Sequence, residues 1–294
     1  MARTIKSLKT PLRYPGGKSR AVSKLLQFLP DLSQAKEYRE LFLGGGSVAL
    51  EVAKRYPHLK IWVNDLYPAL INFWQILQTN PEGLHNQLLF YKNQYPDPTP
   101  AQKKDKNFEY PAKKLFDKLK DDLDSQQMPS CFHKAVAFYI VNKCSFSGLT
   151  EASSFSKQAS VSNWSVKGME RLPEYAKIIK NWRFSNHNYA EHLINDPDVF
   201  IYLDPPYDIE DNLYGKRGSY HRDFDHDEFA NRCNTCQAKL LISYNDEQLV
   251  KDRFRDPTKW TVDNFAHTYT MRSTGEYNKE QATRDELVIF NYEV

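Results

Sequence analysis

The chain has 294 residues, with 40 basic and 37 acidic side chains and a formal net charge of +3. This length suits one large α/β domain, or a core domain that carries a smaller insert. The sequence holds no apolar run long enough to cross a bilayer, and residues 1–6 lack the apolar stretch of a secretory signal. We therefore expect a cytosolic protein and exclude the membrane and secreted classes.

The charge is unevenly distributed along the chain. Seven basic residues precede the first acidic residue, Asp31: Arg3, Lys6, Lys9, Arg13, Lys18, Arg20 and Lys24. A segment of this kind suits contact with a phosphate backbone, although a solvated arm accounts for it equally well.

Two of the four cysteines, Cys233 and Cys236, form a single CxxC pair. A structural zinc needs four ligands, usually as two close pairs. We therefore predict no metal site and interpret the pair as cysteines that face the core from one helix.

The first third of the chain alternates between helical and strand patterns. In chain order we expect a helix over 19–29, a strand over 40–43, a helix with Ser47 as its N-cap that ends before Pro57, a strand over 61–63 and a helix over 69–77 opened by Pro68. Strands that alternate with helices predict a parallel, doubly wound sheet.

The pattern changes between the two parts of the predicted sheet. Residues 92–130 contain the breaker Tyr-Pro-Asp-Pro-Thr-Pro at 95–100 and are then rich in Lys and Asp, which indicates an insert outside the sheet. A helix is expected over 132–141, and the Ser-rich stretch 144–168 has no clear period. Unbroken apolar runs at 199–203 and 240–243 are typical of buried parallel strands, and residues 260–269 and 286–290 predict an antiparallel hairpin at the sheet edge.

Gly44-Gly45-Gly46 follows a predicted strand and opens a helix. Asp65 ends the next strand about 20 residues later, where an acidic side chain can bind ribose hydroxyls. This spacing predicts a nucleoside cofactor on a Rossmann-like sheet without identifying it. Gly44, Gly46 and Ala49 also satisfy the dinucleotide pattern, so a dehydrogenase remains an alternative, as does a tight turn with no ligand.

A second glycine turn, Tyr14-Pro15-Gly16-Gly17-Lys18-Ser19, invites a P-loop interpretation. The P-loop pattern needs a glycine five residues before Gly17, where Leu12 stands, so that interpretation fails. Lys18 can instead bind a carboxylate, such as that of a methionine moiety, or lie exposed at a helix N-terminus.

Asp204-Pro205-Pro206-Tyr207 lies at the carboxyl end of a predicted buried strand, the edge where open α/β sheets bind ligands. Asp204 and the Pro205 carbonyl can accept hydrogen bonds from an amino group, and Tyr207 offers a ring for a base to stack on. When both hydrogens of an adenine amine are donated to such acceptors, the amine favours the pyramidal form, which can attack a methyl sulfonium. A Pro-Pro turn with an incidental Asp is the structural alternative.

The Lys18 turn, the glycine turn after Phe42-Leu43, Asn64-Asp65 and the Asp204 motif occur in the same order as in the Dam-like DNA adenine N6-methyltransferases. The sequence resembles this family over the whole chain in outline. It implies an S-adenosylmethionine-dependent enzyme that extrudes an adenine from duplex DNA. By resemblance, the cofactor-binding residues are Tyr14, Lys18, Phe42, Gly44, Gly46, Ser47, Asp65 and Asp204. The residues that hold the adenine are, on the same basis, Asp204, Pro205, Pro206 and Tyr207.

Residues 142–149 resemble the start of the hairpin that this family uses to read bases. Ser147 stands where Dam has Asn, so GATC specificity does not follow. The predicted DNA contacts are Asn142, Lys143, Lys157, Lys216, Arg217 and Arg222. Residues 243–246 end a core strand and are a further candidate for the adenine pocket.

The expected architecture is a catalytic domain of residues 1–78 and 175–294 with a mainly helical target-recognition domain inserted at 79–174. The expected partner is duplex DNA, bound by a monomer. A cognate restriction endonuclease that acts on the same DNA without binding the enzyme is compatible with the sequence, which does not show whether one exists. Two alternatives stay open: methylation of RNA or protein on the same fold, which Asp204 disfavours because glutamine-modifying relatives usually carry Asn there, and a DNA-binding module that has lost catalysis.

Overall fold

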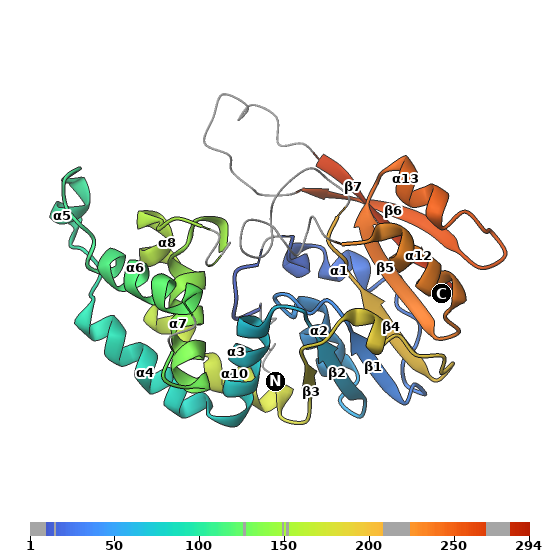
Figure 1. The fold of residues 1–294 in the computed structure, drawn as a ribbon, viewed down its shortest axis with the longest axis horizontal. Coiled ribbons are helices and arrows are strands. Elements are labelled where there is room, and N and C mark those ends of the chain that lie inside the picture. The colour runs from blue at the N-terminus through green and yellow to red at the C-terminus, as the bar shows by residue number, and fades with distance from the viewer. Residues whose placement is uncertain are drawn as a thin grey trace, which may run out of the picture.

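The computed structural model describes residues 10–14, 16–125, 128–148, 150, 153–207, 224–268 and 283–294. Within these residues, seven strands form one sheet in the order β3-β2-β1-β4-β5-β7-β6 (Figure 1). The strands are β1 Glu37–Glu40, β2 Lys60–Asn64, β3 Arg183–Ser185, β4 Val199–Leu203, β5 Lys239–Asn245, β6 Thr261–Thr268 and β7 Thr283–Phe290. Strands β1 to β5 pair in parallel, and β7 pairs antiparallel with both β5 and β6. The predicted doubly wound sheet with a C-terminal antiparallel hairpin is therefore confirmed.

Strand β4 shows why its sequence is apolar without interruption. Phe200 and Tyr202 belong to one hydrophobic core, whereas Val199, Ile201 and Leu203 belong to a second core on the other face. Both faces of a central parallel strand are covered, so neither set of side chains meets water. The covering helices of the second core are α12, His226–Thr235, and α13, Gln248–Arg253.

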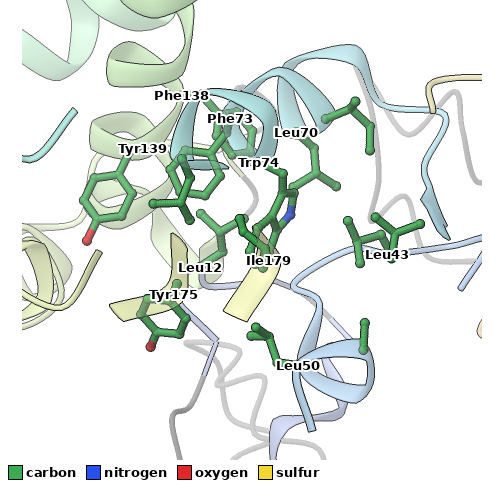
Figure 2. Packing of buried hydrophobic residues seen from close by; sticks show 14 of the residues in the cluster. Leu12, Leu43, Leu50, Leu70, Phe73, Trp74, Phe138, Tyr139, Tyr175 and Ile179 are labelled. Carbon is green, nitrogen blue, oxygen red and sulfur yellow. The ribbon is translucent and has the colours of Figure 1, made fainter. Parts of the chain in front are cut away.

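The first core continues from the sheet into the helical part of the chain. Phe73 of α3, Pro68–Thr79, lies beside Phe138 of α7, Cys131–Cys144, and packs against the Trp74 ring of its own helix (Figure 2). The Phe73 and Phe138 ring centres are 5.8 Å apart, and Phe73 and Trp74 are completely buried. Burial of one such side chain contributes roughly 2–3 kcal/mol, so this contact joins the two parts of the chain firmly.

Helices fill the chain between β2 and β3. They are α3, α4 Pro81–Gln94, α5 Pro100–Lys104, α6 Pro111–Asp124, α7, α8 Lys157–Ser162, α9 Val166–Met169 and α10 Leu172–Ile179. Helices α3 to α6 each begin with proline. The N–H groups of the first turn have no partner within a helix, so proline, which lacks an N–H, is tolerated at that position. The predicted insert is thus helical, and its action as a separate DNA-reading domain stays a prediction.

Three predicted boundaries near the N-terminus are wrong in detail. Strand β1 ends at Glu40 and does not span 40–43, because the chain then turns toward the glycines. Ser47 is not an N-cap: Gly46 occupies that position with φ 68°, and Ser47 is the first residue of α2, Ser47–Arg55. The helix expected over 19–29 consists of the 3-10 turn Lys18–Arg20 and the short helix α1, Val22–Leu25.

A row of side chains crosses the three neighbouring strands β1, β2 and β3. Arg39 pairs in register with Trp62, and Trp62 pairs with Arg183. The two guanidinium groups lie 4.4 and 4.0 Å from the Trp62 ring centre, within the range of cation–π attraction. This row connects the three-residue strand β3 to the rest of the sheet.

The helices that the structure describes include none with the length and apolarity needed to span a membrane.

Candidate active site

The candidate site lies at the carboxyl ends of β1 and β4, which are neighbours in the sheet. The chain leaves β1 toward β2 on one side and leaves β4 toward β5 on the other. This reversal opens a crevice between the strand ends in doubly wound sheets. The glycine turn follows β1 and Asp204 follows β4, so the fold brings together the two motifs that the sequence singled out.

Two glycines of the turn are required by their backbone and by their neighbours. Gly44 and Gly46 have φ values of 47° and 68°, in the left-handed region that side chains disfavour. A Cβ atom on Gly46 would lie 2.9 Å from the Trp74 ring, and one on Gly44 would lie 3.0 Å from the Tyr14 ring. Tyr14 therefore packs directly on the turn.

Asp65 joins the ends of β1 and β2. Its Oδ2 accepts a hydrogen bond from the Gly44 N–H at 2.9 Å, and its Oδ1 accepts one from the Tyr67 N–H at 3.0 Å. Burial raises the pKa of Asp65 to about 7, although the Gly44 N–H acts against the increase. The spacing of Asp65 after the glycines thus corresponds to a direct contact.

The two carboxylate oxygens of Asp204 differ in their hydrogen bonds. Oδ1 accepts hydrogen bonds from Lys18 Nζ at 2.6 Å and from Ser243 Oγ at 3.0 Å. In the part of the chain that the structure describes, Oδ2 has no hydrogen-bond or ionic partner, and the side chain is 19% exposed. Burial raises the pKa of Asp204; Lys18 opposes this increase and Glu286 adds to it. One edge of the carboxylate is fixed and the other is open.

Lys18 is buried among acceptors that belong to the protein. Its ammonium lies 2.6 Å from Asp204 Oδ1, 2.6 Å from the Tyr207 hydroxyl and 3.1 Å from Glu286 Oε1. Burial alone would lower the pKa of Lys18, but the two carboxylates outweigh it and the pKa is raised. The carboxylates that Lys18 meets are therefore those of Asp204 and Glu286.

Tyr207 is held by both its hydroxyl and its ring. The hydroxyl accepts a hydrogen bond from Lys18 and donates one to Glu286. The ring stacks on Tyr244 of β5, with ring centres 5.9 Å apart and planes 21° from parallel. Residues 243 and 244 thus lie beside Asp204 and Tyr207, as expected for the end of β5.

Two buried acids at this edge were not among the predicted site residues. Glu286 of β7 is completely buried, and the sequence signal was an acid directly before the apolar run Leu-Val-Ile-Phe. Glu40, the last residue of β1, is 2% exposed and accepts a hydrogen bond from the Tyr38 hydroxyl at 2.7 Å. Burial raises the pKa of Glu40 to about 8; the Tyr38 hydroxyl acts against this and Asp204 adds to it.

The remaining predicted cofactor residues occupy two sides of the sheet. Ser47 Oγ lies 2.8 Å from Ser19 Oγ and so connects α2 to the turn around Lys18. Phe42 packs with the second core, where its ring centre is 5.3 Å from that of Tyr189 and 6.0 Å from that of Phe229. Tyr14 packs with the first core, so the two rings lie over different faces.

Asn142 does not offer its side chain to DNA in this structure, which corrects the predicted direct contact. It is completely buried in α7 and accepts a hydrogen bond from the Arg13 N–H at 3.0 Å. Its amide donates to the Arg13 carbonyl at 2.6 Å and to the Gly148 carbonyl at 3.3 Å. Asn142 therefore fastens the segment before Lys18 to the start of the predicted base-reading hairpin.

The predicted basic DNA contacts differ in their surroundings. Lys143 is half-buried, with its ammonium 5.4 Å from the Tyr139 ring centre. Burial, with a smaller contribution from Arg13, lowers the pKa of Lys143 to about 7. Lys157 at the start of α8 is exposed. Lys216, Arg217 and Arg222 lie outside the described residues, as do Pro15 and Leu149 of the quoted motifs.

The CxxC pair contributes to the second core. Cys233 in the last turn of α12 and Cys236 at its C-cap are both buried free thiols. Burial raises the pKa of each thiol, so neither has the character of a reactive thiolate.

Residues 14–271 match the family model described as the D12 class N6 adenine-specific DNA methyltransferase. The chain belongs to this family. It is an adenine-specific DNA methyltransferase, and the dehydrogenase alternative for the glycine turn is wrong.

Curated relatives agree with the family assignment. The chain is 23% identical to the type II methyltransferase M.MjaIII of Methanocaldococcus jannaschii, over 80% of this chain and 84% of the relative. It is 26% identical to a DNA adenine methylase of Vibrio cholerae, over 69% of this chain and 66% of that protein. It is 24% identical to the modification methylase StsI of Streptococcus sanguinis, where the match covers 99% of this chain and 44% of the longer relative. These names fit a restriction-modification or Dam-like role.

Proposed function

We propose that this methyltransferase moves a methyl group from S-adenosylmethionine to N6 of an adenine extruded from duplex DNA, with Asp204 to Tyr207 holding the adenine. The observation that carries the proposal is the open Oδ2 edge of Asp204 at the sheet crevice, beside the Tyr207 ring. The open Oδ2 can accept a hydrogen bond from an amine, and the Tyr207 ring offers a flat surface on which a base can stack.

The described residues fit the methyl donor chemically. Asp65 and the Gly44 turn supply the carboxylate and the close backbone approach that a ribose requires. Glu40 interacts electrostatically with both Asp65 and Asp204, and the pKa values of all three acids are raised, so a cationic ligand would favour their ionised forms. S-adenosylmethionine, when bound, supplies an electrophilic methyl group on a cationic sulfonium.

The residues after β4 favour a nucleophilic amine. The adenine N6 lone pair is delocalised into the ring, and acceptors on both amine hydrogens favour the pyramidal form. Asp204 Oδ2 and the Pro205 carbonyl are the two acceptors that we assign. Because Pro205 and Pro206 lack N–H groups, the backbone here offers oxygen acceptors without competing donors.

Lys18 supports this geometry through Asp204. Its ammonium holds Oδ1 together with Ser243, which fixes the direction in which Oδ2 points. After transfer, N6 carries one proton too many, and the raised pKa of Asp204 makes Oδ2 a better acceptor for that proton than an exposed aspartate would be.

We further propose that the enzyme binds duplex DNA as a monomer and reads it with the helical insert. Extrusion of a paired base costs a few kcal/mol, which contacts to the DNA backbone must offset. Lys143 and Lys157 are the described basic side chains that we assign to phosphate contacts. A restriction endonuclease that shares the target sequence is compatible with the relatives named type II methyltransferase and modification methylase.

The test uses S-adenosylmethionine with a labelled methyl group and unmethylated duplex DNA, followed by digestion to nucleosides. We expect label in N6-methyladenine, and a decrease of at least about 1,000-fold in Asp204→Ala with DNA affinity changed less than threefold. Asp198→Ala removes an exposed aspartate just before β4 and serves as the matched control. Label in RNA or protein but not DNA would overturn the assigned substrate, and normal turnover in Asp204→Ala would overturn the assigned site.

A further inference from the structure

Glu286 is a completely buried acid that the assigned chemistry does not use directly. It lies on β7, where it pairs in register with Asn245 of β5 and Phe265 of β6. A buried carboxylate is costly unless it is paired, so its partners indicate why it is tolerated there.

The partners of Glu286 are the groups that surround the proposed adenine pocket. Its Oε1 lies 3.1 Å from Lys18 Nζ and accepts the hydrogen bond of the Tyr207 hydroxyl. Lys18 in turn contacts both Asp204 Oδ1 and the Tyr207 hydroxyl at 2.6 Å. Glu286, Lys18, Tyr207 and Asp204 therefore form one connected network.

We propose that Glu286 is a positioning residue for methyl transfer, which fixes the Tyr207 ring by its hydroxyl and holds Lys18 so that only Oδ1 of Asp204 is engaged. This inference rests on the proposed function of Asp204 and Tyr207. Without Glu286, Lys18 would have Asp204 as its remaining carboxylate partner in this network and could engage both of its oxygens. The Tyr207 hydroxyl would lose the Glu286 carboxylate as an acceptor, so the ring on which the base stacks would lose one of the contacts that fix it.

The charges of the network make a pH measurement informative. The titratable groups that act on Asp204 are Lys18 of the first 3-10 turn, Glu40 of β1, Tyr202 of β4 and Glu286 of β7. Glu286 raises the pKa of Asp204 by repulsion. Removal of that charge must shift the ionisation of Asp204 to lower pH.

The test compares methyl transfer by the wild type, Glu286→Gln and Asp285→Asn. Glu286→Gln keeps the shape and removes the charge, whereas Asp285→Asn removes a charge from the neighbouring exposed side chain of the same strand. We expect kcat to fall about 10–100-fold in Glu286→Gln, with KM for S-adenosylmethionine and affinity for DNA within about twofold. The acidic limb of the kcat profile should shift to lower pH, and Asp285→Asn should behave as the wild type.

The outcomes separate this inference from the proposed function. A wild type without DNA methylation contradicts the function, whereas an active wild type with an equally active and unshifted Glu286→Gln contradicts only the positioning role. Should Glu286→Gln fail to fold by circular dichroism, Tyr207→Phe tests the same contact, because it removes the hydroxyl and keeps the ring. An unchanged kcat in Tyr207→Phe would then overturn the inference.

Discussion

The carboxyl edge of the sheet gathers acidic side chains, whereas the end of α7 in the helical insert brings basic side chains together. At the sheet edge lie four acids, Glu40, Asp65, Asp204 and Glu286, and the Lys18 ammonium pairs with two of them, Asp204 and Glu286. At the insert, Lys143 lies beside Arg13 and makes no ion pair among the described residues. An acidic edge suits an amine and a cationic donor, and a cationic segment suits phosphate. On the proposed function, we therefore expect the two regions to contact different parts of one DNA substrate.

Asn142 connects these regions, so its removal should have the largest effect on stability. Asn142→Ala leaves the Arg13 N–H and the Arg13 and Gly148 carbonyls without their buried partner. We expect the free energy of unfolding to fall by about 3 kcal/mol in urea denaturation. Asn163→Ala, an asparagine beyond the end of α8 that is not buried, is the control, and equal losses in both variants would contradict the connecting role.

Glu40 should give the acidic edge a distinctive pH dependence. Its pKa is about 8 in the folded protein, against an ordinary value of 4.5, so the folded state binds this proton more tightly than the unfolded state. The stabilisation is fully present below pH 4.5 and is lost as pH rises through about 8. From pH 6 to 8 we expect Glu40 to lower the free energy of unfolding by about 2 kcal/mol.

Denaturation of the wild type and Glu40→Gln at both pH values measures this contribution. The variant should lose less stability between pH 6 and 8, because glutamine does not ionise. Identical losses would mean that Glu40 titrates like an exposed acid.

Substitution of Lys143 should have the smallest effect, and it should change only the affinity for DNA. With its pKa lowered to about 7 by burial and by Arg13, its charge is present at pH 6 and mostly absent at pH 8. DNA affinity should therefore fall about threefold more from pH 6 to 8 in the wild type than in Lys143→Gln, and the salt slope at pH 6 should decrease by about 1 in the variant. Exposed Lys157→Gln should change the salt slope without changing the pH dependence. A pH dependence that survives in Lys143→Gln would exclude Lys143 as its source.

The sequence predicted those parts of the site that local patterns encode. The apolar run before Asp204 marks a buried strand, and the position after such a strand lies at the ligand edge by topology alone. The sequence also placed Asp65 at the end of the second strand, and in the structure it directly follows β2 and accepts a hydrogen bond from the Gly44 N–H. That Asp65 binds the cofactor stays a prediction.

Other features depend on contacts between distant segments. Glu286 reaches Lys18 because β7 returns antiparallel beside β5 in a particular register, which no local pattern specifies. Asn142 matches a base-reading motif by residue type, but the motif does not reveal that the Arg13 backbone would occupy its amide. Ser47 has the side chain of a good N-cap, yet Gly46 takes that position because the turn requires a left-handed residue there.

The row of Arg39, Trp62 and Arg183 has a consequence for how the enzyme behaves at high concentration. Strand β3 is the edge of the sheet next to β2, and an edge strand is a template on which another chain can add. Here that strand is only three residues long and carries the exposed cation Arg183, held over the Trp62 ring. A second copy that approached this margin would meet a like charge and few backbone groups to pair with. The margin is thus protected against edge-to-edge aggregation by its own side chains.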